Sequence, residues 1–114
     1  MKNQFKKSLE LFSEEEKYLP AGTTSNARLA RNFCPTDVPC AIFAKKARGA
    51  YIWDVDNNKY IDYRLGFGPV ILGHSYPKIL QAIHKIEKNG VIYALDNELE
   101  IKVAKKINKI VKCA

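Results

Sequence analysis

The sequence predicts a small α+β fold, in which one antiparallel sheet lies between helical segments. Three observations support this prediction. Apolar residues recur at helical spacing near both ends of the chain, residues 41–63 are rich in β-branched and aromatic residues, and a glycine-rich stretch follows them. The predicted order is therefore a helix, a loop, antiparallel strands, a glycine-rich loop and two helices.

The length and the net charge of the chain limit the kinds of protein that it could be. A chain of 114 residues allows at most one domain with a modest core, and 46% hydrophobic residues argue against disorder. The formal net charge of +7 comes mostly from lysines spread along the chain. A scattered excess of this kind suits solubility and anionic ligands as well as it suits nucleic acid, so nucleic acid is an unfavoured partner.

The first element is predicted to be an amphipathic helix over residues 1–19. Phe5, Leu9 and Phe12 recur at helical spacing, and Pro20 ends the pattern.

Residues 20–40 are polar and without a clear period, which predicts a loop. Within this loop Arg28 lies close to Ser25, and a guanidinium group there could clamp a carboxylate through paired hydrogen bonds. Considered alone, a solvated arginine is the commoner explanation.

Residues 41–63 are predicted to form antiparallel strands at residues 41–44, 50–55 and 59–63. The last two are separated by Asp and Asn residues at 56–58, which indicates a hairpin with an Asx-type turn.

Residues 64–76 form a predicted glycine-rich loop, and residues 77–112 form two predicted helices. Ser75 could cap the first helix, and Gly90 ends it. Asn97 and Glu100 resemble a capping box at the start of the second helix.

Sites for metals are not indicated. Asp54, Asp56 and Asn58 follow the spacing of a calcium loop, but the glycine and glutamate that such a loop needs further on are absent, so a plain hairpin turn is favoured. His74 and His84 lack a nucleophile and carboxylate at a catalytic spacing, which favours a structural or surface role for each.

Cysteines and hydropathy bear on the compartment. Cys34, Cys40 and Cys113 form no zinc pattern, and their odd number, with no signal peptide, predicts reduced thiols in the cytoplasm. No apolar run is long enough to span a bilayer, so no membrane partner is expected.

Four stretches in order resemble the class III pyridoxal-phosphate-dependent aminotransferases, and within them the glutamate-1-semialdehyde aminomutase branch. They are PAGTTSNAR from Pro20, RGAYIWDVDNNKYIDY from Arg48, YRLGFGPVILGHSYP from Tyr63 and YALDNELEIKVAKKI from Tyr93. The resemblance runs from about Leu11 to Ala114. It implies that the chain is the N-terminal segment of a fold-type I transferase, lacking the large α/β cofactor domain and the Schiff-base lysine, and inactive alone.

The resemblance also implies roles for individual positions. Ser25 and Arg28 match residues that meet the substrate's carboxylate side, and Phe67 matches a tryptophan that walls the substrate pocket. Gly66 and Phe67 replace serine and tryptophan, so a class III aminotransferase acting on a different aldehyde or ketone is an alternative.

The expected cofactor of the intact enzyme is pyridoxal 5'-phosphate, with no catalytic, cofactor-binding or metal residue in this chain. The expected partners are a small amino-aldehyde or amino-acid-like substrate, the remainder of the enzyme chain and a second subunit of a homodimer. The alternative from another class is a small basic nucleic-acid-binding module, suggested by the charge.

Overall fold

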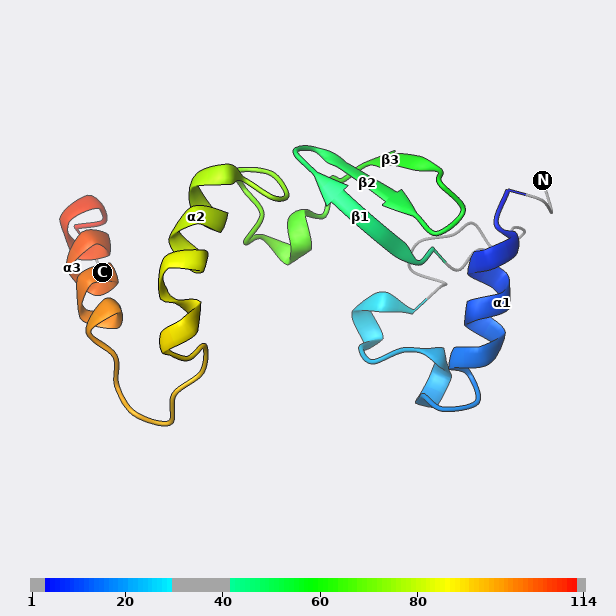
Figure 1. The fold of residues 1–114 in the computed structure, drawn as a ribbon, viewed down its shortest axis with the longest axis horizontal. Coiled ribbons are helices and arrows are strands. Elements are labelled where there is room, and N and C mark those ends of the chain that lie inside the picture. Colours follow the sequence, from blue (N-terminus) through cyan, green and yellow to red (C-terminus); the bar gives the residue numbers. More distant parts are fainter. Residues whose placement is uncertain (1–3, 30–41, 113–114) are drawn as a thin grey trace. The chain divides into compact units, whose positions relative to one another are not determined.

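The computed structural model describes residues 4–29 and 42–112, which fall into two compact units (Figure 1). The first unit is Met1–Tyr76 and the second is Pro77–Ala114. Each unit is described by itself.

Helix α1, Lys6–Glu15, opens the first unit and is shorter than the predicted helix over residues 1–19. Its N-cap residue, Phe5, has no side chain that can cap, and its first turn carries no acidic residue. Beyond Glu15 the chain passes into turns and a short 3-10 helix, η1 (Pro20–Gly22), which begins with the proline expected to stop the helix.

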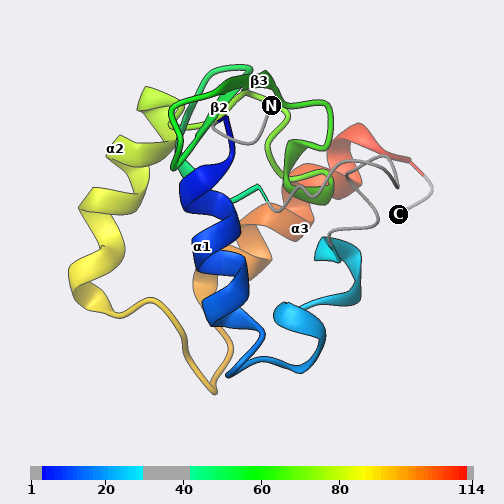
Figure 2. The same cartoon turned by 90° about the vertical axis from the view of Figure 1, so that its right-hand side faces the viewer.

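The start of α1 is capped from a distant part of the sequence. The Asp56 carboxylate accepts hydrogen bonds from the backbone N–H of Lys7 at 2.8 Å and of Ser8 at 2.9 Å, and from the Ser8 hydroxyl at 2.7 Å. Figure 2 shows the β2–β3 end of the sheet beside the N-terminal end of α1. Partial burial raises the pKa of Asp56, but the hydrogen bonds from Ser8 and Lys7 outweigh it and hold the pKa below its ordinary value. A carboxylate in this position also opposes the positive end of the helix dipole.

The three-stranded antiparallel sheet is confirmed, with strand order β1-β2-β3. Its strands are β1 (Ala44–Arg48), β2 (Tyr51–Asp54) and β3 (Lys59–Ile61). The prediction for the first strand, residues 41–44, was wrong because it excluded the charged residues Lys45, Lys46 and Arg48. These residues are exposed on an edge strand, where long charged side chains are well tolerated.

The turn between β2 and β3 is built around a buried carboxylate. Asp54 is 0% exposed and accepts hydrogen bonds from the Asn58 backbone N–H at 2.7 Å, the Asn58 side-chain amide at 2.8 Å and the Tyr60 hydroxyl at 2.7 Å. The Asx-type hydrogen bond of the turn, expected from residues 56–58, is therefore accepted by the Asp54 side chain. The Asp56 side chain instead accepts hydrogen bonds from α1. The largest fully buried side chains among the described residues, Asp54 and Ser8, are both polar.

The second unit contains helix α2 (Pro77–Ile86), the 3-10 turn η5 (Glu87–Asn89) and helix α3 (Glu98–Ile110). The predicted capping box is confirmed, since Asn97 Oδ1 accepts the Leu99 N–H at 2.9 Å and the Asn97 N–H donates to Glu100 at 3.2 Å. The helical stretch also ends at Gly90 as predicted, and Gly90 has a φ of 108° there. Ser75 does not cap α2, because its hydroxyl donates to the Ala47 carbonyl at 3.1 Å.

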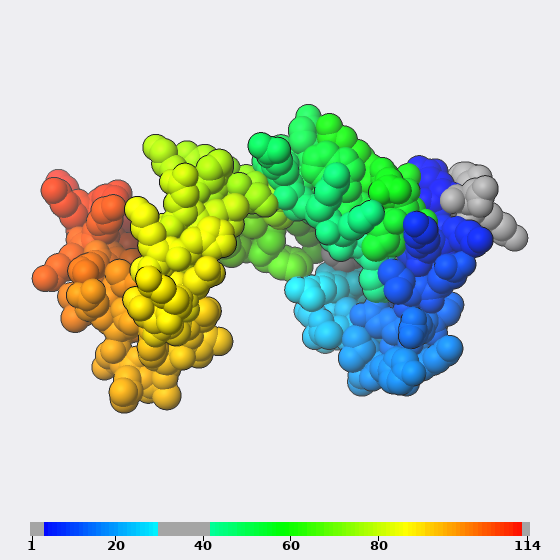
Figure 3. Space-filling model, viewed as in Figure 1, coloured from blue at the N-terminus to red at the C-terminus, as the bar shows by residue number. Residues whose placement is uncertain are grey.

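Both helices of the second unit leave their apolar faces exposed. Figure 3 draws the second unit, residues 77–112, in yellow to red. In residues 77–112 only Asn97 is even half-buried. Fully burying one such aliphatic side chain contributes about 1.5–3 kcal/mol, a stabilisation that the exposed side chains of these helices do not provide within the second unit. The exposed apolar residues on the two faces include Ile79, Leu80, Ile83, Ile86, Leu99, Val103 and Ile107.

Candidate functional site

Ser25 and Arg28, the two predicted carboxylate-binding residues, share one short turn. Ser25 is the N-cap of the 3-10 helix η2 (Asn26–Arg28), and its hydroxyl oxygen accepts the Ala27 N–H at 3.3 Å. The Arg28 N–H closes the turn on the Ser25 carbonyl at 2.8 Å. Both residues are exposed, so the turn presents a hydroxyl and a guanidinium group together at the surface.

The Arg28 side chain is steered by a neighbouring hydroxyl group. Its Nη1 donates to Thr24 Oγ1 at 3.2 Å, a contact that orients the guanidinium group without neutralising its charge. A guanidinium group held in this way can pair with a carboxylate through two parallel N–H donors.

Phe67, the predicted pocket wall, lies on a different loop. It ends the 3-10 helix η4 (Leu65–Phe67) with a φ of 64°, and the residue is 61% exposed. The guanidinium carbon of Arg64 lies 5.5 Å from the ring centroid. A positive φ at a bulky residue is strained and persists only where the surrounding chain enforces it.

A hydrogen-bonded pair closes the base of that loop. The His74 ring nitrogen Nε2 lies 2.7 Å from Asp62 Oδ2, while Asp62 Oδ1 accepts the backbone N–H of Arg64 at 2.8 Å and of Leu65 at 3.1 Å. The hydrogen bond from His74, opposed by partial burial and aided by the two backbone N–H groups, holds the pKa of Asp62 below its ordinary value.

Sequence reasoning had assigned no role to Asp62. An Asp just before a glycine-rich loop is a common Asx-turn signal, and this signal could have identified it. The predicted structural role of His74 agrees with its place in this pair.

The structure joins Ser25 to Arg28 but describes no contact between either residue and Phe67. Residues 30–41, which connect the two regions in sequence, lie outside the described residues, as do Cys34, Cys40 and Cys113.

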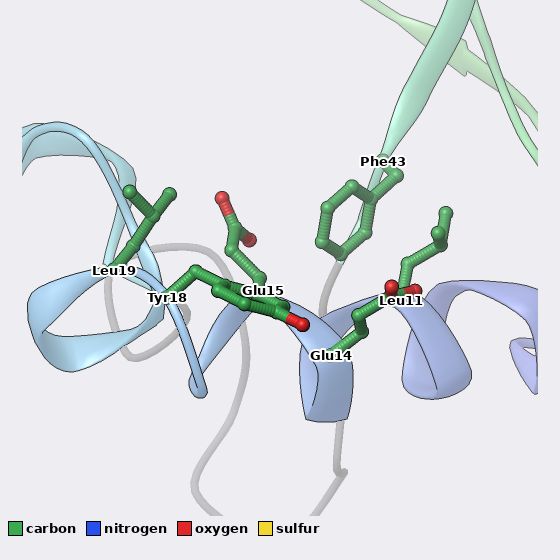
Figure 4. A pocket seen from close by; sticks show the side chains of 6 residues that line it. All are labelled: Leu11, Glu14, Glu15, Tyr18, Leu19 and Phe43. Carbon is green, nitrogen blue, oxygen red and sulfur yellow. The ribbon is translucent and has the colours of Figure 1, made fainter.

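A separate apolar hollow lies beside α1 (Figure 4). Its volume is about 330 Å³, and none of the predicted site residues line it. Apolar side chains supply most of its wall, which suits packing against another part of the protein better than chemistry. Its lining residues are Leu11, Glu14, Glu15, Tyr18, Leu19 and Phe43.

Other kinds of site find little support in the described part of the chain. No group of three or more His, Cys, Asp or Glu residues there could hold a metal ion. None of the helices within residues 4–29 and 42–112 is both long and apolar enough to cross a membrane.

Comparison with known proteins gives consistent matches. Residues 33–113 match the family model described as aminotransferase class-III. The chain is 45% identical over 112 residues to a glutamate-1-semialdehyde 2,1-aminomutase from Sulfurihydrogenibium sp. (strain YO3AOP1), covering 98% of this chain and 25% of that protein. A Fusobacterium nucleatum protein of the same name is 40% identical over 107 residues, covering 94% of this chain and 24% of that protein. The chain thus spans about a quarter of the length of these relatives.

Solved structures match the fold. A glutamate-1-semialdehyde-aminomutase from Pseudomonas aeruginosa PAO1 superposes with a TM-score of 0.77 at 22% identity, covering 95% of this chain and 23% of that one. An omega-transaminase from Sphaerobacter thermophilus gives a TM-score of 0.74 at 27% identity, covering 90% and 22%. These matches confirm the predicted fold class, an α+β segment of a fold-type I transferase.

Proposed function

Because the chain belongs to the class-III aminotransferase family, we propose that it is the N-terminal part of an enzyme resembling glutamate-1-semialdehyde 2,1-aminomutase. The enzyme moves an amino group on a small amino-aldehyde or amino-acid-like substrate, and it works in the cytoplasm as a homodimer. The observation that carries the proposal is the 45% identity to an aminomutase across 98% of this chain.

The cofactor of the intact enzyme is pyridoxal 5'-phosphate, which supplies an electron sink for the substrate when bound. The described residues alone do not fit this group. A Schiff-base lysine is activated in a desolvated pocket, whereas every lysine in residues 4–29 and 42–112 is exposed. We therefore assign no catalytic or cofactor-binding residue within the described part of this chain.

What this chain contributes is substrate binding. The Arg28 guanidinium group pairs with the substrate carboxylate, and the Ser25 hydroxyl donates a further hydrogen bond to it. The short turn that holds both groups supports this role, because it reduces the freedom lost when the substrate binds.

Phe67 forms an apolar wall of the substrate pocket. Its exposed ring and its strained backbone support this role, since strain of this kind clusters at binding sites. The family resemblance places a tryptophan at this position in the aminomutase branch, and the smaller phenylalanine is the reason for the alternative proposal, a class III aminotransferase acting on a different aldehyde or ketone.

The first experiment tests whether the chain acts alone. The purified 114-residue chain is mixed with pyridoxal phosphate, passed through a gel-filtration column and examined by absorbance. We expect no stoichiometric lysine adduct to survive the column. A stable adduct with catalytic turnover would overturn this part of the proposal.

The second experiment tests Arg28 in the whole enzyme. Arg28→Lys keeps the charge but loses the planar fork, so we expect KM to rise by roughly tenfold while kcat changes less. Arg48→Lys, at an exposed arginine of β1, is the matched control and should leave KM unchanged. Equal effects of the two substitutions would contradict the role of Arg28.

A further inference from the structure

The glycine-rich loop that carries Phe67 has its two ends joined by a side-chain contact. Asp62 follows β3 and His74 precedes α2, and their side chains meet at 2.7 Å. The Asp62 side chain is 6% exposed and the His74 side chain 21% exposed, so water competes little for this bond.

The backbone holds His74 in place independently of its side chain. Gly49 and His74 form an isolated antiparallel bridge, with N–H to carbonyl distances of 2.9 Å in both directions. Gly73 lets the two segments approach, because a Cβ atom there would lie 3.0 Å from the Gly49 Cα. The His74 backbone is thus fixed to the β1–β2 turn, so its imidazole ring projects from a fixed point and can act as an anchor for Asp62.

Asp62 links His74 to the first turn of the loop. One carboxylate oxygen meets His74, while the other accepts the N–H groups of Arg64 and Leu65. That turn places Leu65 at a φ of 52° and Phe67 at a φ of 64°, conformations that a free loop would abandon.

We propose that Asp62 and His74 are positioning residues, which close the base of the glycine-rich loop and thereby hold the Phe67 ring where it faces the substrate. The closure of the loop stands on the contacts above, and only the purpose of Phe67 rests on the proposed function.

The test is amide hydrogen exchange in the 114-residue chain, without substrate or cofactor. The loop probes are the N–H groups of Phe67, Gly68 and Val70, which donate to carbonyls of the same loop at 2.9–3.1 Å. The reference probes are the N–H groups of Asp54 and Val55, which donate within the sheet region at 3.1 and 2.9 Å.

The variants separate the side chain of His74 from its backbone. In His74→Ala the loop probes should exchange about tenfold faster or more, as expected for loss of a hydrogen bond to a carboxylate, while the reference probes stay unchanged. His74→Gln keeps a side-chain N–H donor and should restore most of the protection. His84→Ala, at an exposed histidine of α2, is the control and should change neither set.

Three results would overturn the proposal: unchanged loop exchange in His74→Ala, equal acceleration in His74→Ala and His74→Gln, or equal acceleration of the loop and reference probes. The last would mean that His74 supports the sheet through Gly49 rather than the loop through Asp62. Since no substrate is present, this outcome is independent of the Arg28 experiment, which tests the proposed function.

Discussion

Replacing Tyr60 with phenylalanine removes one of the hydrogen bonds on which the first unit depends. The Tyr60 hydroxyl donates to Asp54 Oδ2 at 2.7 Å, and Asp54 is completely buried at the turn between β2 and β3. In Tyr60→Phe, this oxygen keeps only the side-chain amide of Asn58, at 2.8 Å. A hydrogen bond to a charged group contributes about 1.5–3 kcal/mol, and because Tyr60 is only half-buried we expect a loss near the lower end.

Trp53 provides the assay for this loss. It is the single tryptophan of the chain and lies on β2 directly before Asp54. Urea unfolding followed by its fluorescence should therefore report the free energy of unfolding of the sheet. Tyr63→Phe is the matched control, because Tyr63 is 86% exposed, and it should change this free energy by less than about 0.5 kcal/mol.

The pH dependence gives a second check on the same bond. Burial, followed by the hydrogen bond to Asp54, raises the pKa of Tyr60. A group whose pKa is raised on folding stabilises the fold below its ordinary pKa, and loses that contribution as the pH rises through the raised value. The difference between the parent chain and Tyr60→Phe should stay constant up to about pH 10 and shrink above it. A loss no larger than that of Tyr63→Phe at neutral pH would refute the reasoning.

Three further changes test other parts of the fold. Because the hydrogen bond from His74 lowers the pKa of Asp62, this pair stabilises the loop above the ordinary carboxyl pKa of about 4, and protection of the loop N–H groups should fall as the pH drops below it. Asp56→Asn should lower the helix signal of α1 in far-UV circular dichroism, whereas Asp96→Asn, at an exposed aspartate before α3, should not. Gly73→Ala places a Cβ atom 3.0 Å from the Gly49 backbone at a φ of 86°. The substitution should lower the free energy of unfolding by about 1–3 kcal/mol in the same fluorescence assay. An unchanged urea midpoint would argue against the close approach of the two segments.

The features that could be predicted from the sequence are the local ones. Asn97 and Glu100 are three residues apart and cap α3 as predicted, and Gly90 ends the helical stretch after α2. The cap of α1 could not be found in this way, because its donors and its acceptor are 48 and 49 residues apart. A sequence pattern reports neighbours along the chain, whereas this contact depends on the register of the sheet.

In the candidate site, too, local features could be predicted from the sequence and contacts between distant residues could not. Arg28 was a candidate from residue chemistry, but its pairing with Ser25 in a substrate role, and the role of Phe67, came only from the family resemblance. The bond between Asp62 and His74 was missed because it joins two ends of a loop across 12 residues. The apolar faces of α2 and α3 were predicted from their helical spacing, but that spacing could not show that the faces are exposed within the second unit.

The cap on α1 has a consequence for the order in which the chain folds. With 10 residues, α1 is shorter than the helices that persist alone in water. It leaves the ribosome before the hairpin does, and the carboxylate that satisfies its first N–H groups is synthesised 48 residues after Ser8. Helix α1 therefore gains its cap only after the hairpin has been synthesised, and on a ribosome that stalls before residue 56 this helix should be unformed.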